Sequence, residues 1–490
     1  MVRRTDSDSL PLNGAAVPED LDLRGLRTAY AAFLLTAVGR IGELVPGLGA
    51  LPLAKISMGI VAVLLIAKWK RLPKLPAVAT PFVRTALALV ALAVVTAPFS
   101  IWLGQTVHFL TLQLPVIAAA VIVCCKISYT WDVLRGIMRI VVVAAVALAL
   151  VAILAFHGGR ADASVSYDPN DLAYVLVSTL PLALAFALTV RTKVKILTNA
   201  ALCTVLLVAL LLTSSRGGFF GLLAMLAVLV LLPLRRPPSG GYWLPQVRQS
   251  RNRIVLPVVG LLCASTLAWP YLPAQTRDRL SSVLQLSSDY NMDSTNRDGR
   301  SAIWERGLTA AMRRPIGYGA DTYQMVDVRM GGKFRAPHNS YLEVLVELGF
   351  LGLLLFIRMY VLSWRALQRV RRSLLAVAPS EQHDEMLVFA RMLQVALVGN
   401  AVSGFFLSMS YSTLLWILFA VVIAGVALVN SILATGRTSL VKLSKPEDPV
   451  NTAARGGEPH GGENPLENYL DGARPRKKKA RSSARRSTGA

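Results

Sequence analysis

The chain has 490 residues, a mean hydropathy of +0.51 and a formal net charge of +24 at pH 7. With 54% hydrophobic residues it is too apolar for an ordinary soluble protein. Its basic residues are divided between short connections and the polar end of the chain, which argues against nucleic-acid binding. All four cysteines lie in apolar segments, which argues against a disulfide framework and a structural zinc site.

Apolar runs of about 20 residues recur along the chain, long enough to cross a hydrocarbon layer roughly 30 Å thick. We therefore expect an all-α, polytopic membrane protein. The pattern predicts twelve spans, at residues 28–45, 51–68, 84–102, 107–125, 132–155, 170–190, 196–213, 217–234, 253–271, 339–359, 386–408 and 412–432.

Alternate connections between these spans are rich in Lys and Arg, as cytoplasmic loops are. This bias and the even count of spans predict that both termini are cytoplasmic. The chain then divides into five parts. Residues 1–27 are a disordered N-terminal tail, 28–271 nine spans, 272–338 a long outer loop with helical patterning, 339–432 three spans, and 433–490 a disordered basic C-terminal tail.

The predicted topology brings four polar groups to the outer side of the membrane. The first is Thr213–Gly218, where Ser214 or Ser215 can cap the next helix and Arg216 can bind a phosphate through two hydrogen bonds. A helix N-terminus suits an anion, because its N–H groups have no partner within the helix. The alternative is an arginine that reaches lipid headgroups.

The second group lies in the outer loop, where Arg300 and Trp304 are neighbours on one face of a helix. A guanidinium beside an indole suits a sugar phosphate, with charge for the phosphate and stacking for the ring. The alternative is a cation–π pair that only stabilises the helix.

The third group is His338 with Asn339, at the entry to the tenth span. A histidine near its ordinary pKa can take a proton from a hydroxyl. Glu343 lies further along the same span, one turn before Glu347. The two carboxylates either take part in the site or reach interfacial water.

The fourth group precedes the sixth span, where Asp168 and Asn170 either contribute to the site or only cap the helix. No metal-binding motif accompanies these groups. The sequence therefore predicts a metal-free site in which Arg216, Arg300 and His338 meet.

These motifs, in this order, resemble the O-antigen ligase and polysaccharide polymerase superfamily of bacterial inner-membrane proteins. The resemblance covers about residues 28–432 and rests on four segments: Ser214–Gly217, Arg300 with Trp304, Pro315–Gly319, and His338–Glu343 with Gly349 and Gly352. The basic C-terminal tail lies outside this pattern.

The resemblance implies a membrane glycosyltransferase of the C type that works at the periplasmic face without a metal or other cofactor. Its donor would be a glycan on undecaprenyl diphosphate, and its acceptor a second carrier-linked repeat unit or the lipid A core. Arg216 and Arg300 would hold the diphosphate, and His338 would act as the general base or orient the acceptor. Trp304, Asn339, Ser215, Asp168, Asn170 and Glu343 are the expected substrate-binding residues. Membrane lipids and other glycan-assembly proteins are the further expected partners.

Polymerisation of O-antigen or exopolysaccharide units is our first expectation, with ligation to lipid A core as the alternative. A transporter or flippase of lipid-linked glycan is the alternative from another class. It would place charges at the middle of the bilayer, whereas the charges here gather at the outer ends of the spans.

Overall fold

The computed structural model describes residues 23–45, 47–49, 51–73, 79–163, 167–231, 299–377 and 380–443, with single residues at 270, 274, 277 and 278. The chain divides into two compact units, residues 1–438 and 439–490, and the description below concerns the first. Its helices are α1 Arg24–Ala37, α2 Ile41–Leu44, α3 Leu53–Lys68, α4 Thr80–Thr96, α5 Leu103–His108, α6 Leu114–Ile127, α7 Trp131–Leu154, α8 Pro169–Thr189, α9 Lys193–Leu212, α10 Arg216–Leu231, α13 Arg300–Arg313, α14 Tyr323–Arg329, α15 Ser340–Leu375, α16 Glu381–Gly404 and α17 Thr413–Leu443.

Eight segments of the described chain are long and apolar enough to cross a membrane. They are Thr80–Phe99, Leu103–Ile127, Trp131–Leu154, Pro169–Thr189, Lys193–Leu212, Ser340–Leu375, Glu381–Gly404 and Thr413–Ala434. The apolar α10 is shorter, at 16 residues. The expected polytopic helical class is confirmed, and the count of twelve stays a prediction. The predicted span 253–271 lies almost wholly outside the described residues, as do most of the two predicted tails.

The first predicted span, 28–45, is interrupted. α1 ends at Ala37 and α2 begins at Ile41, because Arg40 adopts a left-handed backbone with φ +49°. Arg40 forms an ion pair with Glu43, at 3.2 Å.

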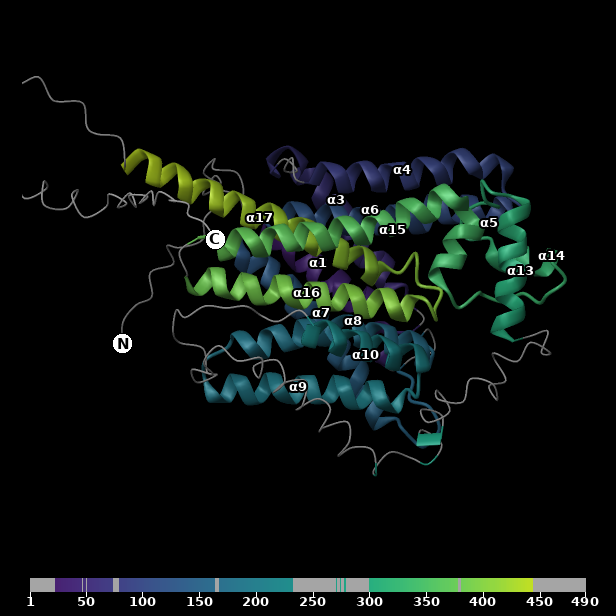
Figure 1. Cartoon of the computed structure of the whole chain (residues 1–490), viewed down its shortest axis with the longest axis horizontal. Helices are drawn as coiled ribbons and strands as arrows, with labels where there is room; N and C mark the ends of the chain where they lie inside the picture. The colour runs from purple at the N-terminus through teal and green to yellow at the C-terminus, as the bar shows by residue number, and fades with distance from the viewer. Residues whose placement is uncertain are drawn as a thin grey trace, which may run out of the picture. The chain divides into compact units, whose positions relative to one another are not determined.

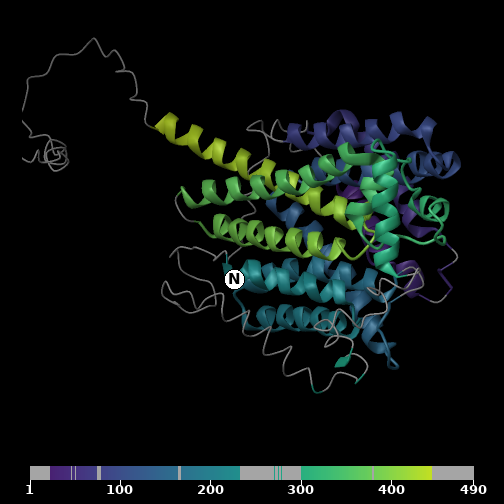
Figure 2. The ribbon, with the colours of Figure 1, turned by 45° about the vertical axis from the view of Figure 1, so that its right-hand side comes forward.

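The helices of the bundle run side by side, and α13 crosses their ends (Figures 1 and 2). α8 and α16 form its interior, since most of their residues are buried, whereas only a minority of the α9 residues are buried. Glycines let α10 approach α16 closely: a Cβ added at Gly399 would lie 2.6 Å from Met225. Small residues at such contacts are the usual means of packing helices in a membrane. In the first turn of α10, the Gly217 carbonyl accepts from the Ser403 hydroxyl of α16 at 3.2 Å.

α15 is broken at Gly349, where φ +70° and ψ −172° are not helical. The break frees backbone carbonyls, and the loop before α14 uses them: Tyr318 donates its N–H to Val346 at 3.0 Å and Gly319 donates to Glu347 at 2.9 Å. Gly317 and Gly319 both have positive φ, as this close backbone pairing requires. The predicted span 339–359 thus begins where expected, but the helical segment continues to Leu375 beyond the break.

α13, α14 and the start of α15 share a small core of their own, which includes Ile303, Tyr323 and Leu342. The buried carboxylate of Glu347 fastens this unit to the bundle. It accepts hydrogen bonds from the N–H groups of Asp321, Thr322 and Tyr323, at 2.8–3.0 Å, and from the Tyr411 hydroxyl at 2.6 Å. The helical patterning predicted in the long outer loop is confirmed at α13.

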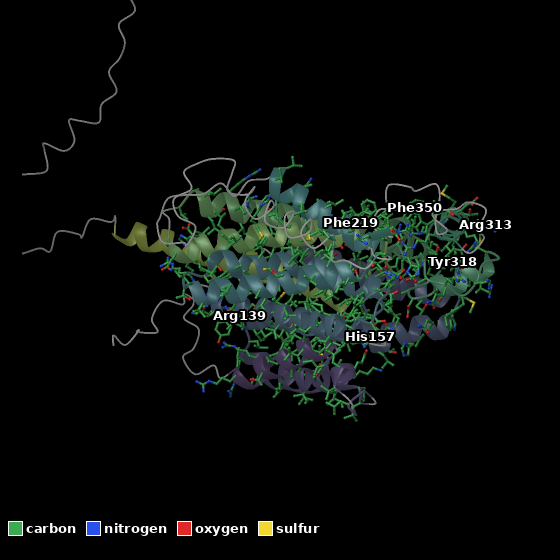
Figure 3. All side chains as sticks on the ribbon, turned by 90° about the horizontal axis from the view of Figure 1, so that it is seen from below. Arg139, His157, Phe219, Arg313, Tyr318 and Phe350 are labelled. Carbon is green, nitrogen blue, oxygen red and sulfur yellow. The ribbon has the colours of Figure 1, made fainter. Side chains whose placement is uncertain are left out.

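Nitrogen and oxygen atoms gather at one end of the bundle, around Tyr318 and Arg313, whereas its middle is mostly carbon (Figure 3). This polar end contains the site described next.

Candidate active site

A cavity of about 250 Å³ opens at the polar end of the bundle. Its lining comes from five separate parts of the chain: Arg160, Asp168, Asn170, Ser214, Ser215, Arg216, Gly217, Arg300, Ile303, Arg335, His338 and Phe406. The three predicted catalytic residues, Arg216, Arg300 and His338, are therefore brought together around one space. Ser215, Asp168 and Asn170, predicted to bind substrate, line the same space.

Four helices begin at this cavity. Asp168 caps α8, Arg216 is the first residue of α10, Arg300 is the first residue of α13, and His338 precedes the cap of α15. Each helix N-terminus carries partial positive charge from its N–H groups. Four such ends around one cavity create a favourable place for an anion.

The charged side chains that line the cavity also favour an anion. Four arginines, Arg160, Arg216, Arg300 and Arg335, face one carboxylate, Asp168, among the lining residues in the described chain. A guanidinium offers a planar set of donors that matches phosphate oxygens. The cavity is thus suited to a ligand with more than one negative charge.

A hydrogen-bond network joins the two polar turns on one side of the cavity. Asn170 accepts from Arg160 Nη2 at 2.6 Å and from Ser215 Oγ at 3.1 Å, and Arg160 Nε donates to the Thr213 carbonyl at 3.0 Å. The start of α8 is therefore tied to the start of α10. Asp168 also caps α8, through the N–H groups of Asn170 and Asp171, so it both caps the helix and lines the cavity.

The start of α10 has the local structure that the Ser-Ser-Arg-Gly-Gly pattern predicts. Ser214 turns the chain with φ +50°, and Ser215 caps the helix by accepting from the Gly218 N–H at 3.3 Å. A Cβ added at Gly217 would lie 2.7 Å from the Phe406 Cβ. The glycine therefore lets Phe406 pack against the helix at the edge of the cavity.

His338 is held in an unusual backbone conformation, with φ +47°. Its neighbours fix it: the Pro337 carbonyl accepts from Trp304 Nε1 at 2.8 Å, and Asn339 caps α15 through the N–H groups of Tyr341 and Leu342. Burial lowers the pKa of His338 below its ordinary value, and the nearby Arg300 and Arg335 lower it further, against the opposing effect of Asp168. The imidazole is therefore neutral at pH 7 and able to accept a proton.

Three predicted substrate-binding residues lie away from the cavity lining. The Trp304 ring packs edge-on against Phe405, with centroids 5.3 Å apart, while its N–H supports Pro337. Asn339 uses its side-chain oxygen as a helix cap. The Glu343 carboxylate accepts from the Ser410 hydroxyl.

Two lining residues, Arg160 and Arg335, were not among the predicted site residues. Arg160 follows Gly158 and Gly159, both with positive φ, and Arg335 lies three residues before His338. Both are basic residues on the predicted outer side, where membrane proteins carry few basic residues. That departure from the bias is the signal that would have found them.

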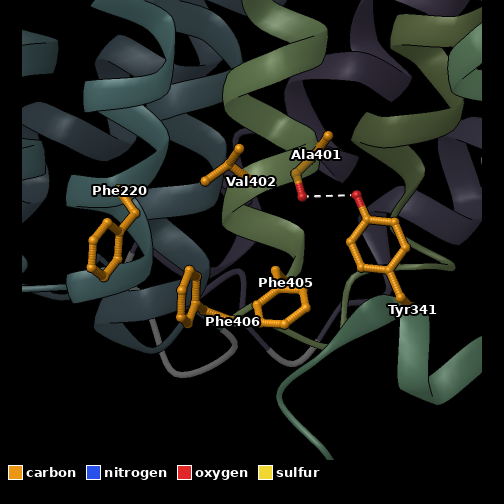
Figure 4. A pocket seen from close by; sticks show the side chains of 6 residues that line it. All are labelled: Phe220, Tyr341, Ala401, Val402, Phe405 and Phe406. Atoms are coloured by element: carbon orange, nitrogen blue, oxygen red, sulfur yellow. Dashed lines mark hydrogen bonds between the residues drawn. The ribbon is translucent and has the colours of Figure 1, made fainter. Parts of the chain in front are cut away.

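An apolar groove of about 580 Å³ adjoins the cavity through the shared residue Phe406. Phe220 of α10, Tyr341 of α15 and Phe405 line it, with Ala401 and Val402 of α16 (Figure 4). The Tyr341 hydroxyl donates to the Ala401 carbonyl at 2.8 Å, so the ring is held in place. A charged cavity thus adjoins an apolar groove.

No group of three His, Cys, Asp or Glu side chains in the described chain lies together as metal ligands would. The residues suited to a ligand are instead the arginines, which bind anions.

Comparison with known proteins bears on the same segment. The family model of the O-antigen ligase matches residues 201–357, a range that contains Arg216, Arg300 and His338. No curated protein matches the chain. Members of this family are enzymes of the ligase and polymerase type, which transfer glycans. The match at residues 201–357 supports the resemblance of the chain to the O-antigen ligase and polysaccharide polymerase superfamily.

Proposed function

We propose that this protein transfers a glycan from undecaprenyl diphosphate to an acceptor hydroxyl, without a metal. One observation carries the proposal: four arginines and a histidine, whose pKa is lowered by burial, line one cavity at which four helices begin. A diphosphate ester is the ligand that this distribution of charge suits best.

In the proposed reaction, the acceptor oxygen attacks the anomeric carbon of the donor sugar. The bond from that carbon to the diphosphate oxygen breaks, and its electron pair leaves with the diphosphate. Arg216 and Arg300 stabilise the charge that develops there, as fixed donors do in other transfer enzymes. His338 accepts the proton of the acceptor hydroxyl, or orients that hydroxyl for attack.

The apolar groove supports a lipid-linked donor. A polyprenyl chain needs an apolar path next to the site that binds its diphosphate, and the groove of Phe220, Phe405 and Phe406 adjoins the cavity. Because the groove is open and surrounded by membrane helices, a lipid can enter it from the side.

The distribution of basic residues supports an orientation in the bacterial inner membrane. The helix ends and connections opposite the cavity carry Arg135, Arg191 and a cluster at 365–372, as the cytoplasmic side of membrane proteins does. The cavity then opens to the periplasm, and both termini lie in the cytoplasm.

For the acceptor, we propose a second carrier-linked repeat unit, so that the protein polymerises O-antigen or exopolysaccharide. The second candidate is transfer to lipid A core, favoured by the description of the matching family as a ligase. Glycan from a deletion strain distinguishes them on a gel. Single repeat units indicate a polymerase, and accumulated carrier-linked polymer indicates a ligase.

Reconstitution tests the transfer itself. The purified protein, in vesicles without an ion gradient and with EDTA present, is given lipid-linked repeat units from its own host. Formation of dimers and longer chains, or of glycosylated lipid A core when that acceptor is added, is the expected result. Movement of the substrate across the bilayer without transfer would instead identify a flippase and overturn the proposal.

A further inference from the structure

A second surface at the polar end carries a pair of aromatic rings, one half-buried and the other exposed. Trp102 and Phe334 lie edge to face, with centroids 5.8 Å apart and planes at 71°. Phe334 is 52% exposed, and it directly precedes Arg335, which lines the cavity. Trp102 directly precedes α5, and α5, α13 and α14 lie together at this end (Figure 1). The rings therefore lie beside the candidate active site.

Planar polar side chains accompany this pair. Gln105, one helical turn after Trp102, donates to Asp321 at 2.6 Å, and Gln113 approaches the same carboxylate oxygen at 3.5 Å. Gln113 belongs to a π-helical turn, Phe109–Gln113, of a kind often found at functional sites. The amides can both donate to and accept from hydroxyl groups, and the carboxylate can accept from them.

The backbone under this surface is fixed. Ile101 donates its N–H to the Tyr318 carbonyl at 2.9 Å, and the Thr106 hydroxyl donates to the Ala320 carbonyl at 2.8 Å. Asp321 is held in a left-handed conformation with φ +60°, while its N–H donates to Glu347. Rings and polar groups on such a support cost little entropy when a ligand binds.

We propose that Trp102, Phe334, Gln105 and Asp321 form a sugar-binding subsite for the glycan acceptor. A pyranose has apolar C–H faces that pack on aromatic rings, and hydroxyl groups at its edge that need planar polar partners. The subsite offers both, next to the cavity. Its assignment to the acceptor rests on the proposed function, whereas its affinity for sugar does not.

The other explanation for exposed aromatic rings is contact with lipid headgroups, as in the aromatic belts of membrane proteins. Phe99 provides an internal contrast, because it is 63% exposed in the same connection and takes no part in the aromatic pair. Belt residues should behave like Phe99, whereas subsite residues should not.

The test measures binding without the donor. The probe is the repeat-unit oligosaccharide that mild acid releases from the host's own lipid-linked glycan. Its contact with the full-length protein in nanodiscs is followed by saturation-transfer NMR. We expect Phe334→Ala and Trp102→Ala to bind about tenfold more weakly. Trp102→Phe, which keeps a ring, should lose less, and Phe99→Ala should bind like the native protein.

Native-like binding by both Phe334→Ala and Trp102→Ala would overturn the proposal. Equal losses in Phe99→Ala would identify a lipid belt and would also overturn it. In the transfer assay, Phe334→Ala should raise the acceptor KM more than it lowers kcat. Sugar binding that depends on Trp102 in a protein without transfer activity would refute the proposed function and leave the subsite in place.

Discussion

The two ends of the helical bundle use arginine differently. Opposite the cavity, Arg135 pairs with Glu385 at 2.9 Å and with Asp132 at 3.2 Å, and Arg191 pairs with Glu381. At the polar end, four arginines line one cavity together with a single lining carboxylate in the described chain. Surface arginines in ion pairs contribute little to stability, whereas arginines that line a cavity where four helices begin are suited to binding an anion. Four predictions test this difference, in decreasing order of expected effect.

Removing a cavity arginine should have the largest effect. We expect Arg216→Ala or Arg300→Ala to lower kcat/KM for glycan transfer about 100- to 1000-fold, because a fixed donor to the leaving group is lost. The matched control is Arg191→Ala at the opposite end, which should transfer at nearly the native rate. A loss in Arg191→Ala as large as in Arg216→Ala would remove the distinction between the two ends.

His338 should come next. His338→Ala is expected to lower kcat about 100-fold, the usual lower limit for a lost general base. His157→Ala is the control at the same end of the bundle, since that ring is exposed and its Nδ1 lies 2.6 Å from the Ala155 carbonyl oxygen. Both variants are assayed at matched protein levels in the reconstituted system. Native kcat in His338→Ala would exclude a direct role in proton transfer.

Glu347 tests whether the polar end depends on its attachment to the bundle. Glu347→Ala leaves three backbone N–H groups and the Tyr411 hydroxyl without their acceptor. We expect a loss of about 3 kcal/mol in stability, because bonds to a charged acceptor are among the stronger ones. Thermal unfolding in detergent measures it, with the exposed Glu305→Ala as control. Equal melting temperatures for the two variants would contradict this role.

The smallest effect concerns pH. The proposed transfer needs a neutral His338. Activity should therefore fall as the pH is lowered through the pKa of His338, which lies below the ordinary 6.5. Arg335→Gln removes a positive charge that lowers this pKa, so the acid limb of kcat should move to higher pH. Asp168→Asn removes a charge that raises it, so the limb should move to lower pH, while Asn still caps α8. Shifts in the same direction would contradict the assignment of the limb to His338.

Local patterns in the sequence predicted much of the candidate site. The Ser-Ser-Arg-Gly-Gly turn, the caps at Asp168 and Asn339, and the helix starting at Arg300 all follow from contacts within a few residues, which a sequence pattern records. For Arg160 and Arg335 the sequence offers only the charge-bias signal, and the fold decides that they line the same cavity as Arg216. The Trp102–Phe334 pair also depends on the fold, because its two residues lie 232 positions apart in the chain.

The amino-acid sequence by itself determined the membrane class, most of the long helices, and the meeting of Arg216, Arg300 and His338 at one end. Hydropathy and charge bias act along the chain, so they can be read without coordinates. Only the tertiary structure decided that α15 breaks at Gly349, that Glu347 clamps α14, and that Trp304 supports Pro337 instead of lining the cavity. These arrangements depend on backbone groups that find partners far along the chain, and hydropathy carries no record of such partners.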